Sequence, residues 1–122
     1  MRLTQSLIVA LTLAVCAVSA SPSSNPEHEK TLRTTKKCEG CDLRHANLGG
    51  FQGQNANLIN ADLTDATFYG GNLRGADLTG AILERTNLEM TDLTGAIGAN
   101  LAAAITDGRT KCPDGTAGPC NK

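Results

Sequence analysis

The sequence of 122 residues contains very few aromatic side chains: two Phe, one Tyr and no Trp. A conventional globular core usually contains more rings, so we expect the interior to be built from small units. Histidine is also scarce, with only His28 and His45, and no serine occurs between residues 41 and 95. This stretch therefore lacks the serine of a Ser-His-Asp arrangement, and its only cysteine, Cys41, is expected to point inward, away from any substrate. We expect no enzymatic activity and no cofactor.

A long apolar segment is also missing, because the uncharged run Leu7–Ala17 is shorter than the ~20 residues that span a bilayer. The run follows Arg2 and precedes the small residues Val18–Ala20, an order typical of a signal peptide cleaved after Ala20. A membrane anchor is the alternative reading, and a lipid attached at Cys16 is a weaker one. Residues 1–20 thus predict export to a secreted or periplasmic location, or to the thylakoid lumen in a cyanobacterium, with no membrane contact after cleavage.

The chain has no strong excess of charge of either sign. Residues 21–122 contain ten Lys and Arg against twelve Asp and Glu, a net charge of two negative. This balance indicates neither a nucleic-acid partner nor a membrane partner.

A five-residue repeat is the feature that the sequence has in abundance. Eleven pentapeptides follow one another without a gap over residues 41–95: CDLRH, ANLGG, FQGQN, ANLIN, ADLTD, ATFYG, GNLRG, ADLTG, AILER, TNLEM and TDLTG. The third position is Leu in nine of them, with Gly53 and Phe68 as exceptions, and the second is mostly Asp or Asn. The first position holds a small residue everywhere except at Phe51.

A period of five excludes the common secondary structures. In an α-helix the leucines would scatter around the axis, and in a flat strand they would alternate between the two faces. Every leucine stays inside only if the chain turns a corner at each repeat, so that four repeats close one coil of twenty residues. Parallel coils then stack at roughly 4.8 Å, and the corners suit Asp, Asn, Gly and Thr.

The predicted coil period can be examined within the sequence, because residue n should lie beneath residue n+20. Leu43, Leu63 and Leu83 then stack on one another. The one bulky first-position residue, Phe51, faces Gly71 in the next coil and lies two residues before Gly53. A large side chain beside two missing ones is the volume compensation that close packing requires.

Tandem A(D/N)LXX repeats resemble those of the pentapeptide-repeat family. The lead-in Thr34–Leu43 is similar to the start of many secreted bacterial members, particularly cyanobacterial ones. The resemblance implies an all-β fold, a right-handed, four-sided (quadrilateral) β-helix. It carries over no catalytic residue, because the family is defined by architecture.

The two ends of such a coil need covers, since each exposes an unpaired strand edge. Asn25 and Pro26 predict the start of a short capping helix over about 26 to 36, with Leu32 turned towards the coil; a disordered leader is the alternative. After Gly95 the register slips, because Ala96–Gly98 are only three residues before the pattern resumes at Ala99 and Ala104. Residues 96–106 are expected to form another coil with a bulge, or else a short helix. The expected organisation is a signal peptide (1–20), a leader with the cap helix (21–40), the β-helix (41–95), and a partial coil with a cysteine-bearing cap (96–122).

Four cysteines remain after signal cleavage: Cys38, Cys41, Cys112 and Cys120. An even number in an exported chain favours disulfides, here 38–41 and 112–120, and the second would fasten the C-terminal cap. Reduced structural cysteines, and redox or metal roles, are the alternatives. One zinc ion shared by all four is disfavoured, since nearly three coils would separate the two pairs by on the order of 13 Å.

These observations favour a structural or interaction module that binds a protein of unknown identity through a face or an end. The oligomeric state stays open, and the coil ends allow end-to-end association. Nucleic-acid mimicry, as in the gyrase-protecting members of the family, is an alternative because residues 41–95 carry seven acidic side chains against three Arg. Export and a rod of only about four base pairs in length argue against it. A weak cation site between the stacked carboxylates of Asp42 and Asp62 is a further alternative, although we predict no metal ligand.

Overall fold

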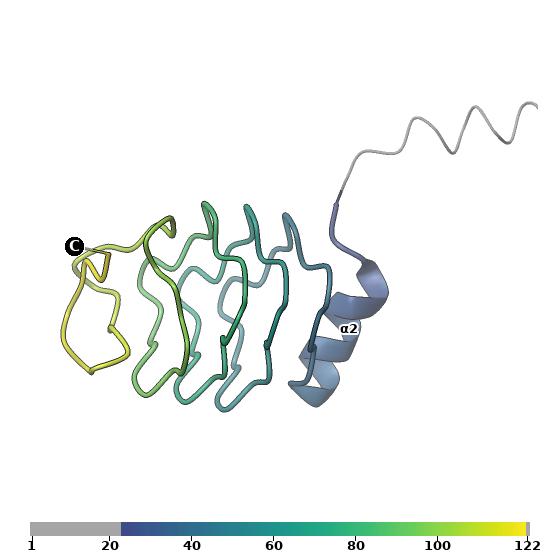
Figure 1. The fold of residues 1–122 in the computed structure, drawn as a ribbon, viewed down its shortest axis with the longest axis horizontal. Coiled ribbons are helices and arrows are strands. Elements are labelled where there is room, and N and C mark those ends of the chain that lie inside the picture. The colour runs from purple at the N-terminus through teal and green to yellow at the C-terminus, as the bar shows by residue number, and fades with distance from the viewer. Residues whose placement is uncertain (1–22, 122) are drawn as a thin grey trace, which may run out of the picture.

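The computed structural model describes residues 23–121, so the predicted signal peptide, residues 1–20, lies outside the described part. The chain winds into coils that stack along one axis, with helix α2 at one end and the C-terminal segment at the other (Figure 1). Second-position residues form single parallel bridges to the residue twenty positions later, for example Asp42 to Asp62 and Asp62 to Ile82. Four repeats therefore complete one coil, as the sequence predicts. No strand longer than one bridge residue forms between residues 23 and 121.

The first and third positions of each repeat fill the interior, which confirms the predicted register. Leu63 is fully buried, and so are seven other third-position leucines: Leu43, Leu48, Leu58, Leu73, Leu78, Leu88 and Leu93. Two first-position threonines, Thr86 and Thr91, are also fully buried. Their hydroxyls donate to the carbonyls of Leu63 and Phe68 in the preceding coil, at 2.8 Å in both cases. The polar atoms are thereby satisfied, so threonine is tolerated where alanine is usual.

Each corner is made by the backbone of the last residue in a repeat. All eleven fifth positions have positive φ, from 52° at Arg85 to 76° at Gly95. Glycine adopts this left-handed conformation freely and Asn or Asp tolerate it, which explains why these residues prevail at the fifth position. Arg85 and Met90 adopt it as well, at φ 52° and 58°. Their side chains have no such preference, so these two corners depend on the bonding of the neighbouring coils.

Phe51 and the two glycines near it form one packing unit. A Cβ atom at Gly53 would lie 2.8 Å from Cδ1 of Phe51 and 3.0 Å from Cδ2 of Leu73, so the ring occupies the space that a leucine would otherwise fill. A Cβ atom at Gly71 would lie 2.8 Å from the carbonyl oxygen of Phe68, and backbone cannot yield as a side chain can. The volume compensation predicted for this repeat is confirmed.

Helix α2, Pro26–Thr35, precedes the first coil. The side chain of Asn25 accepts the Glu27 N–H, and Pro26 occupies the first turn, where its missing N–H costs nothing. Lys36 ends the helix in the left-handed conformation, with its N–H donating to the Leu32 carbonyl. Leu32 is fully buried, as predicted, although the rest of the helix is mostly exposed. No helix within the described residues is long and apolar enough to cross a membrane.

The helix supplies the hydrogen bonds that a preceding coil would supply. In the stack, a second-position residue turns both its N–H and its C=O towards the preceding coil, as when the Asp62 N–H donates to Cys41 and its carbonyl accepts from Leu43. At Asp42 no coil precedes. Its N–H donates instead to Nδ1 of His28 at 2.9 Å, and its carbonyl accepts the Asn25 N–H at 3.1 Å. The guanidinium of Arg33 likewise donates to the Asn47 carbonyl at 2.6 Å.

We expect His28→Ala to weaken this contact, because the half-buried Asp42 N–H loses its acceptor. The free energy of unfolding should fall by about 1 kcal/mol. Hydrogen exchange of the Asp42 amide, followed by NMR, should accelerate relative to the native chain. His45→Asn is the matched control, since it removes the exposed histidine and keeps a residue that tolerates the corner conformation. Unchanged exchange at Asp42 in the first variant would contradict the assigned contact.

Residues 96–106 form a coil and no helix, which settles the two readings of this segment. The bridge period falls from twenty residues at Asp77–Ile97 to eighteen at Asn87–Ile105, because the corner near Gly98 is two residues short. It then rises to nineteen at Asp92–Lys111, because one residue is inserted after Ile105. The shortening lies at the three-residue segment Ala96–Gly98, where the sequence indicates the slip of register, and the inserted residue follows it. Lys111 then pairs with Ala117 in an antiparallel bridge that begins the C-terminal tail.

Candidate functional site

The outer surface of the coils, called the wall below, carries Asp62, Asp77 and Asp92. Each of these side chains accepts hydrogen bonds from the turn that follows it. Oδ1 of Asp62 accepts the Thr64 N–H at 3.1 Å and its hydroxyl at 2.6 Å, and Asp77 and Asp92 have the same contacts with Thr79 and Thr94. These hydrogen bonds, from the Thr79 hydroxyl first, lower the pKa of Asp77. The second-position Asp and Asn residues are therefore explained by turn formation. Among residues 23–121 no three His, Cys, Asp or Glu side chains lie together as metal ligands would.

Arginine side chains neutralise much of the acidic surface of residues 41–95. Arg85 donates two hydrogen bonds to Asp65, at 2.7 and 2.8 Å, across one coil spacing. Arg44 also donates two hydrogen bonds, at 2.9 Å, to Asp42 in its own repeat, and Arg74 reaches Asp92 at 3.3 Å. All three Arg side chains of this block thus contact an acidic residue. The wall does not present the continuous line of free negative charge that a phosphate backbone has.

The two histidines take up unrelated structural positions. His28 accepts the Asp42 N–H beneath α2, whereas Nδ1 of His45 lies 3.9 Å from Oδ2 of Asp65 at a corner. Neither of these contacts includes a hydroxyl or thiol that the imidazole could activate. The role of His28 was not predicted, and its place one helical turn before Leu32 is the sequence signal that could have indicated it.

The four cysteines are joined as disulfides at the two ends of the coil stack. The Cα atoms of Cys38 and Cys41 lie 5.3 Å apart, and those of Cys112 and Cys120 lie 5.5 Å apart, both ordinary disulfide separations. Cys38 and Cys41 are buried beneath α2, where Sγ of Cys38 lies 3.3 Å from the His28 carbonyl oxygen. The pairing in the structure is the one favoured from the sequence.

Asp107 supplies a hydrogen-bond acceptor between neighbouring coils at the point where the coil period changes. Sequence reasoning did not identify this residue. Its Oδ1 accepts the Met90 N–H at 3.1 Å, which takes the place of the carbonyl that the next coil supplies at other corners. The same oxygen accepts the Thr110 N–H at 2.9 Å and the Thr110 hydroxyl at 3.0 Å, and Oδ2 accepts from Arg109. Desolvation raises the pKa of Asp107, but the hydrogen bonds from Met90, Thr110 and Arg109 outweigh it and lower the pKa to about 2.

We expect the fold to lose stability in acid, with Asp107 contributing to the loss. A carboxyl with a lowered pKa in the folded state stabilises the fold at pH values above its unfolded pKa of about 3.9, and this stability is lost as the pH falls towards the folded value. The window for Asp107 is therefore about pH 4 to pH 2. Urea unfolding at pH 6, 4, 3 and 2 should show this decline. The slope should be smaller in Asp107→Asn, and equal slopes would show that the carboxylate is not bound as described.

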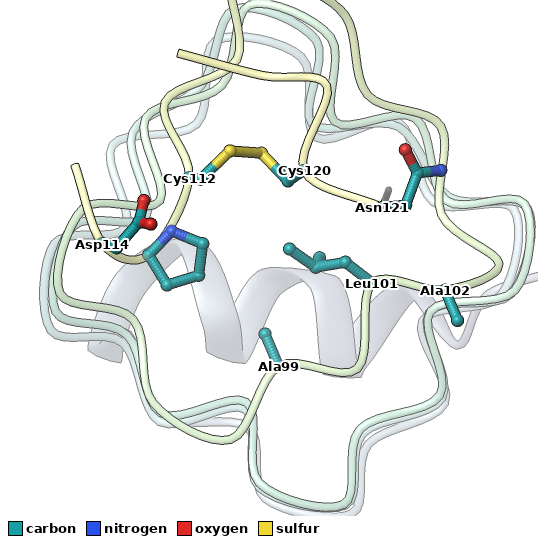
Figure 2. A pocket seen from close by; sticks show the side chains of 8 residues that line it. Ala99, Leu101, Ala102, Cys112, Asp114, Cys120 and Asn121 are labelled. Atoms are coloured by element: carbon teal, nitrogen blue, oxygen red, sulfur yellow. A yellow bond between two sulfur atoms is a disulfide. The ribbon is translucent and has the colours of Figure 1, made fainter. Parts of the chain in front are cut away.

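The C-terminal end of the coil stack contains a pocket of about 430 Å³. Its walls are the last coil on one side and the Cys112–Cys120 bridge with Pro113 on the other. Figure 2 shows the side chains of Ala99 and Leu101 directed into the centre of the coil, facing this bridge. Asn121 closes one edge, because its Nδ2 donates to the Ala104 carbonyl at 2.9 Å. The pocket is lined by apolar side chains together with the polar residues Asp114 and Asn121.

Comparison with known proteins agrees with this geometry. The family model for pentapeptide repeats matches residues 37–75 and 61–97, with eight copies. A crystal structure of a pentapeptide repeat protein from Nostoc PCC 7120 is 28% identical, with a TM-score of 0.54 over 80% of this chain and 88% of that one. One from the Arabidopsis thaliana thylakoid lumen is 25% identical, with a TM-score of 0.39 over 75% of this chain and 65% of that one. No curated protein matches. The repeats, the coil period and the family model together show that this chain belongs to the pentapeptide repeat family.

Proposed function

We propose that the protein is a non-enzymatic, exported module that binds another protein through apolar residues on the outside of its coils. The observation that carries the proposal is the distribution of large exposed apolar side chains. Among the described residues they all lie at position 69 or later, at Tyr69, Ile82, Met90, Ile97 and Ile105. Ile97 is 58% exposed and stands where the preceding coil has Asp77, so apolar residues replace the turn-forming residues on the later coils. These side chains lie on three sides of the coil and share a position in its later turns, and exposed apolar side chains of this kind are typical of protein contacts.

The absence of enzymatic activity is part of the same proposal. The wall carboxylates of Asp62, Asp77 and Asp92 are bound in their own turns, and the cysteines are paired. A catalytic group must be free to contact a substrate, and these side chains already have partners. A rigid scaffold whose polar side chains serve its own turns suits binding better than chemistry.

We further propose a right-handed, four-sided winding, which is the architecture of the family, and a capping role for both ends. α2 would cap the N-terminal edge through His28, Asn25 and Arg33, and the tail after Lys111 would cap part of the other end. The proposed organisation keeps the boundaries expected from the sequence: signal peptide 1–20, leader and cap 21–40, repeats 41–95, and C-terminal coil with cap 96–122.

Export is supported by the composition of residues 1–20 and by the two disulfides, which persist in oxidising compartments. The test is fractionation of cells that express the full chain, followed by intact-mass analysis. We expect a secreted, periplasmic or lumenal protein that begins at residue 21 and lacks free thiols after denaturation without reductant. Recovery from the cytoplasm with residues 1–20 attached, or four free thiols, would contradict the proposal.

Binding through the wall can be tested with a photo-crosslinking amino acid placed at single sites in the exported protein. Tyr69 and Ile82, both 46% exposed, are the test positions. Gln52, an exposed second-position residue on the first coil, is the matched control. We expect one defined crosslinked product at the two test positions and none at Gln52. Equal crosslinking at all three positions would mean that the apolar wall residues form no specific contact.

A further inference from the structure

One side of the last coil is not joined to the coil before it. The last coil forms single parallel bridges on three sides, through Ile97, Ile105 and Lys111. On the fourth side, which follows the shortened corner near Gly98, Ile82 has no bridge to any later residue up to position 121. The regular bonding between neighbouring coils is therefore interrupted on this side of the wall.

Two backbone groups of the earlier coil lose their usual partners at this interruption. In a regular repeat the first-position C=O and the third-position N–H both bond to the next coil, as Ala61 and Leu63 do with Ile82 at 2.9 Å. The corresponding Ala81 C=O and Leu83 N–H have no hydrogen-bond partner in the part of the chain that the structure describes. Both residues are buried, and buried backbone groups are expected to bond to water or to a ligand.

A slot of about 220 Å³ lies where the missing bridge would be. Residues 81–84 form one wall of the slot, and Asn100, Ala102 and Ala103 form the other. Asn100 is the second-position residue of its repeat and would be the bridge partner of Ile82. Its backbone N–H and C=O also lack a partner among residues 23–121. The groups that a regular bridge would have joined are thus two donors and two acceptors, all of them unpaired.

The slot is closed at both ends and open towards the outside. At one end the Arg85 N–H donates to the Ala103 carbonyl at 2.8 Å. At the other end the coils approach closely, since a Cβ atom at Gly98 would lie 2.7 Å from Cα of Thr79. An extended peptide therefore cannot run lengthwise between the coils. A single side chain can enter from the outside, beside Ile82, which is 46% exposed.

The unpaired groups select the chemistry of that side chain. A primary amide matches them, because its NH₂ group donates two hydrogen bonds and its oxygen accepts two. A carboxylate only accepts, and Glu84 in the wall of the slot would repel it. An ammonium or guanidinium group only donates, so that two N–H groups would stay unpaired at a cost. A hydroxyl donates one hydrogen bond and would leave one carbonyl unpaired.

The neighbouring side of the last coil already holds an amide side chain through both of its polar atoms. Nδ2 of Asn121 donates to the Ala104 carbonyl at 2.9 Å, and Oδ1 accepts the Thr106 hydroxyl at 3.1 Å. The Asn121 side chain is seen at the edge of the last coil in Figure 2. In this fold a side-chain amide can therefore bond to coil groups that no further coil reaches.

We propose that the slot binds the side-chain amide of a glutamine in the partner protein. Its amide would bond to the four groups of the missing bridge, while its two methylene groups would pack against Ile82 and Ala102 at the opening. This inference rests on the proposed contact through the wall and deepens it, because it names the chemical group that anchors the partner beside the exposed apolar side chains.

NMR titration of the exported, disulfide-bonded chain with N-acetylglutamine methylamide tests the proposal. We expect the amide signals of Leu83 and Asn100 to shift and saturate, with a dissociation constant on the order of 1 mM, since so small a ligand binds weakly. N-acetylmethionine methylamide has a stem of similar length without the amide, and N-acetylglutamate methylamide has a carboxylate in its place. Neither should give a saturable shift. Equal shifts with all three compounds, or none with any, would overturn the proposal and leave the slot to water.

A variant that covers the opening locates the site. Ala102→Leu should weaken binding of the glutamine compound at least about tenfold, because Ala102 is exposed and lines the slot. Ala117→Leu makes the same change at an exposed alanine outside this slot and should have no effect. Circular dichroism melting curves verify that both variants are folded. An equal effect of the two variants would overturn the assigned site.

Crosslinking of the partner at Tyr69, away from the slot, separates this inference from the proposed function. We expect Ala102→Leu to reduce the Tyr69 crosslink at least about fivefold and Ala117→Leu to leave it unchanged. A Tyr69 crosslink that Ala102→Leu does not reduce would overturn the glutamine anchor and leave the wall contact in place. Saturable binding of the glutamine compound without any crosslink at the wall positions would contradict the proposed function, and the amide site would stand.

Discussion

Replacing Leu63 with arginine is expected to unfold the repeat block. Leu63 is fully buried, and its neighbours above and below in the stack are Leu43 and Leu83, also buried. The guanidinium would enter an interior in which no carboxylate of residues 23–121 is buried. An unpaired buried charge costs several kcal/mol in addition to the lost leucine contacts. A domain of this size is usually stable by only about 5–15 kcal/mol, so most of that stability would be lost.

The measurement is thermal unfolding followed by circular dichroism, compared with Arg74→Ala. The Arg74 side chain is 53% exposed and makes one 3.3 Å contact with Asp92, and exposed ion pairs of this kind are worth less than about 1 kcal/mol. We expect Arg74→Ala to melt almost as the native chain does. For Leu63→Arg we expect no cooperative transition, or a melting temperature lower by tens of degrees. Similar curves for the two variants would mean that the inward register is wrong.

The regular part of the fold could be predicted because one constraint repeats eleven times. Each leucine must stay inside, each corner needs a residue that tolerates positive φ, and only a turn at every fifth residue meets both conditions. The exception at Phe51 could also be predicted, since Gly53 lies two residues later and Gly71 lies one coil later. Local chemistry and coil geometry agree at each of these positions, which makes the inference robust.

The ends were harder to predict because their contacts are unique and join distant residues. The three-residue segment Ala96–Gly98 indicated the slip of register, but the composition of residues 99–105 did not distinguish a coil from a short helix. Asp107 serves Met90, seventeen positions earlier, and its side chain replaces a backbone carbonyl only because the coil period has changed. His28 accepts from Asp42, fourteen positions later, in the same way. A side chain that takes the place of a backbone group leaves little trace in the sequence pattern.

The two ends also differ in a way that the sequence did not show. At the N-terminal end the helix bonds the exposed edge and buries Leu32 and the Cys38–Cys41 bridge. At the C-terminal end the tail reaches only part of the edge, and the uncharged segment 95–106 stays open beside it. A repeat that is nearly uniform along its axis thus acquires two unlike ends.

The second large effect is expected at Phe51 and Gly53, where the residues of the core depart from the usual repeat. Phe51→Ala removes a ring that is 7% exposed, which usually costs about 3–5 kcal/mol. Gly53→Leu restores the usual third-position leucine, but its first side-chain atom would lie 2.8 Å from Cδ1 of Phe51 and 3.0 Å from Cδ2 of Leu73. Overpacking of this kind costs about 1–3 kcal/mol or more. Each single variant should therefore be clearly less stable than the native chain in urea.

The double variant Phe51→Ala with Gly53→Leu should recover most of this loss, because the new leucine fills the space that the ring vacates. Its repeat would read AQLQN, the pattern of the neighbouring repeats, with the introduced leucine stacked beneath Leu73. We expect a stability within about 1 kcal/mol of the native chain, whereas independent effects would add up to about 4 kcal/mol or more. The coupling is obtained from four urea unfolding curves measured side by side. Additive losses would show that the ring and the glycine are not partners, and that some other contact holds Phe51 in the core.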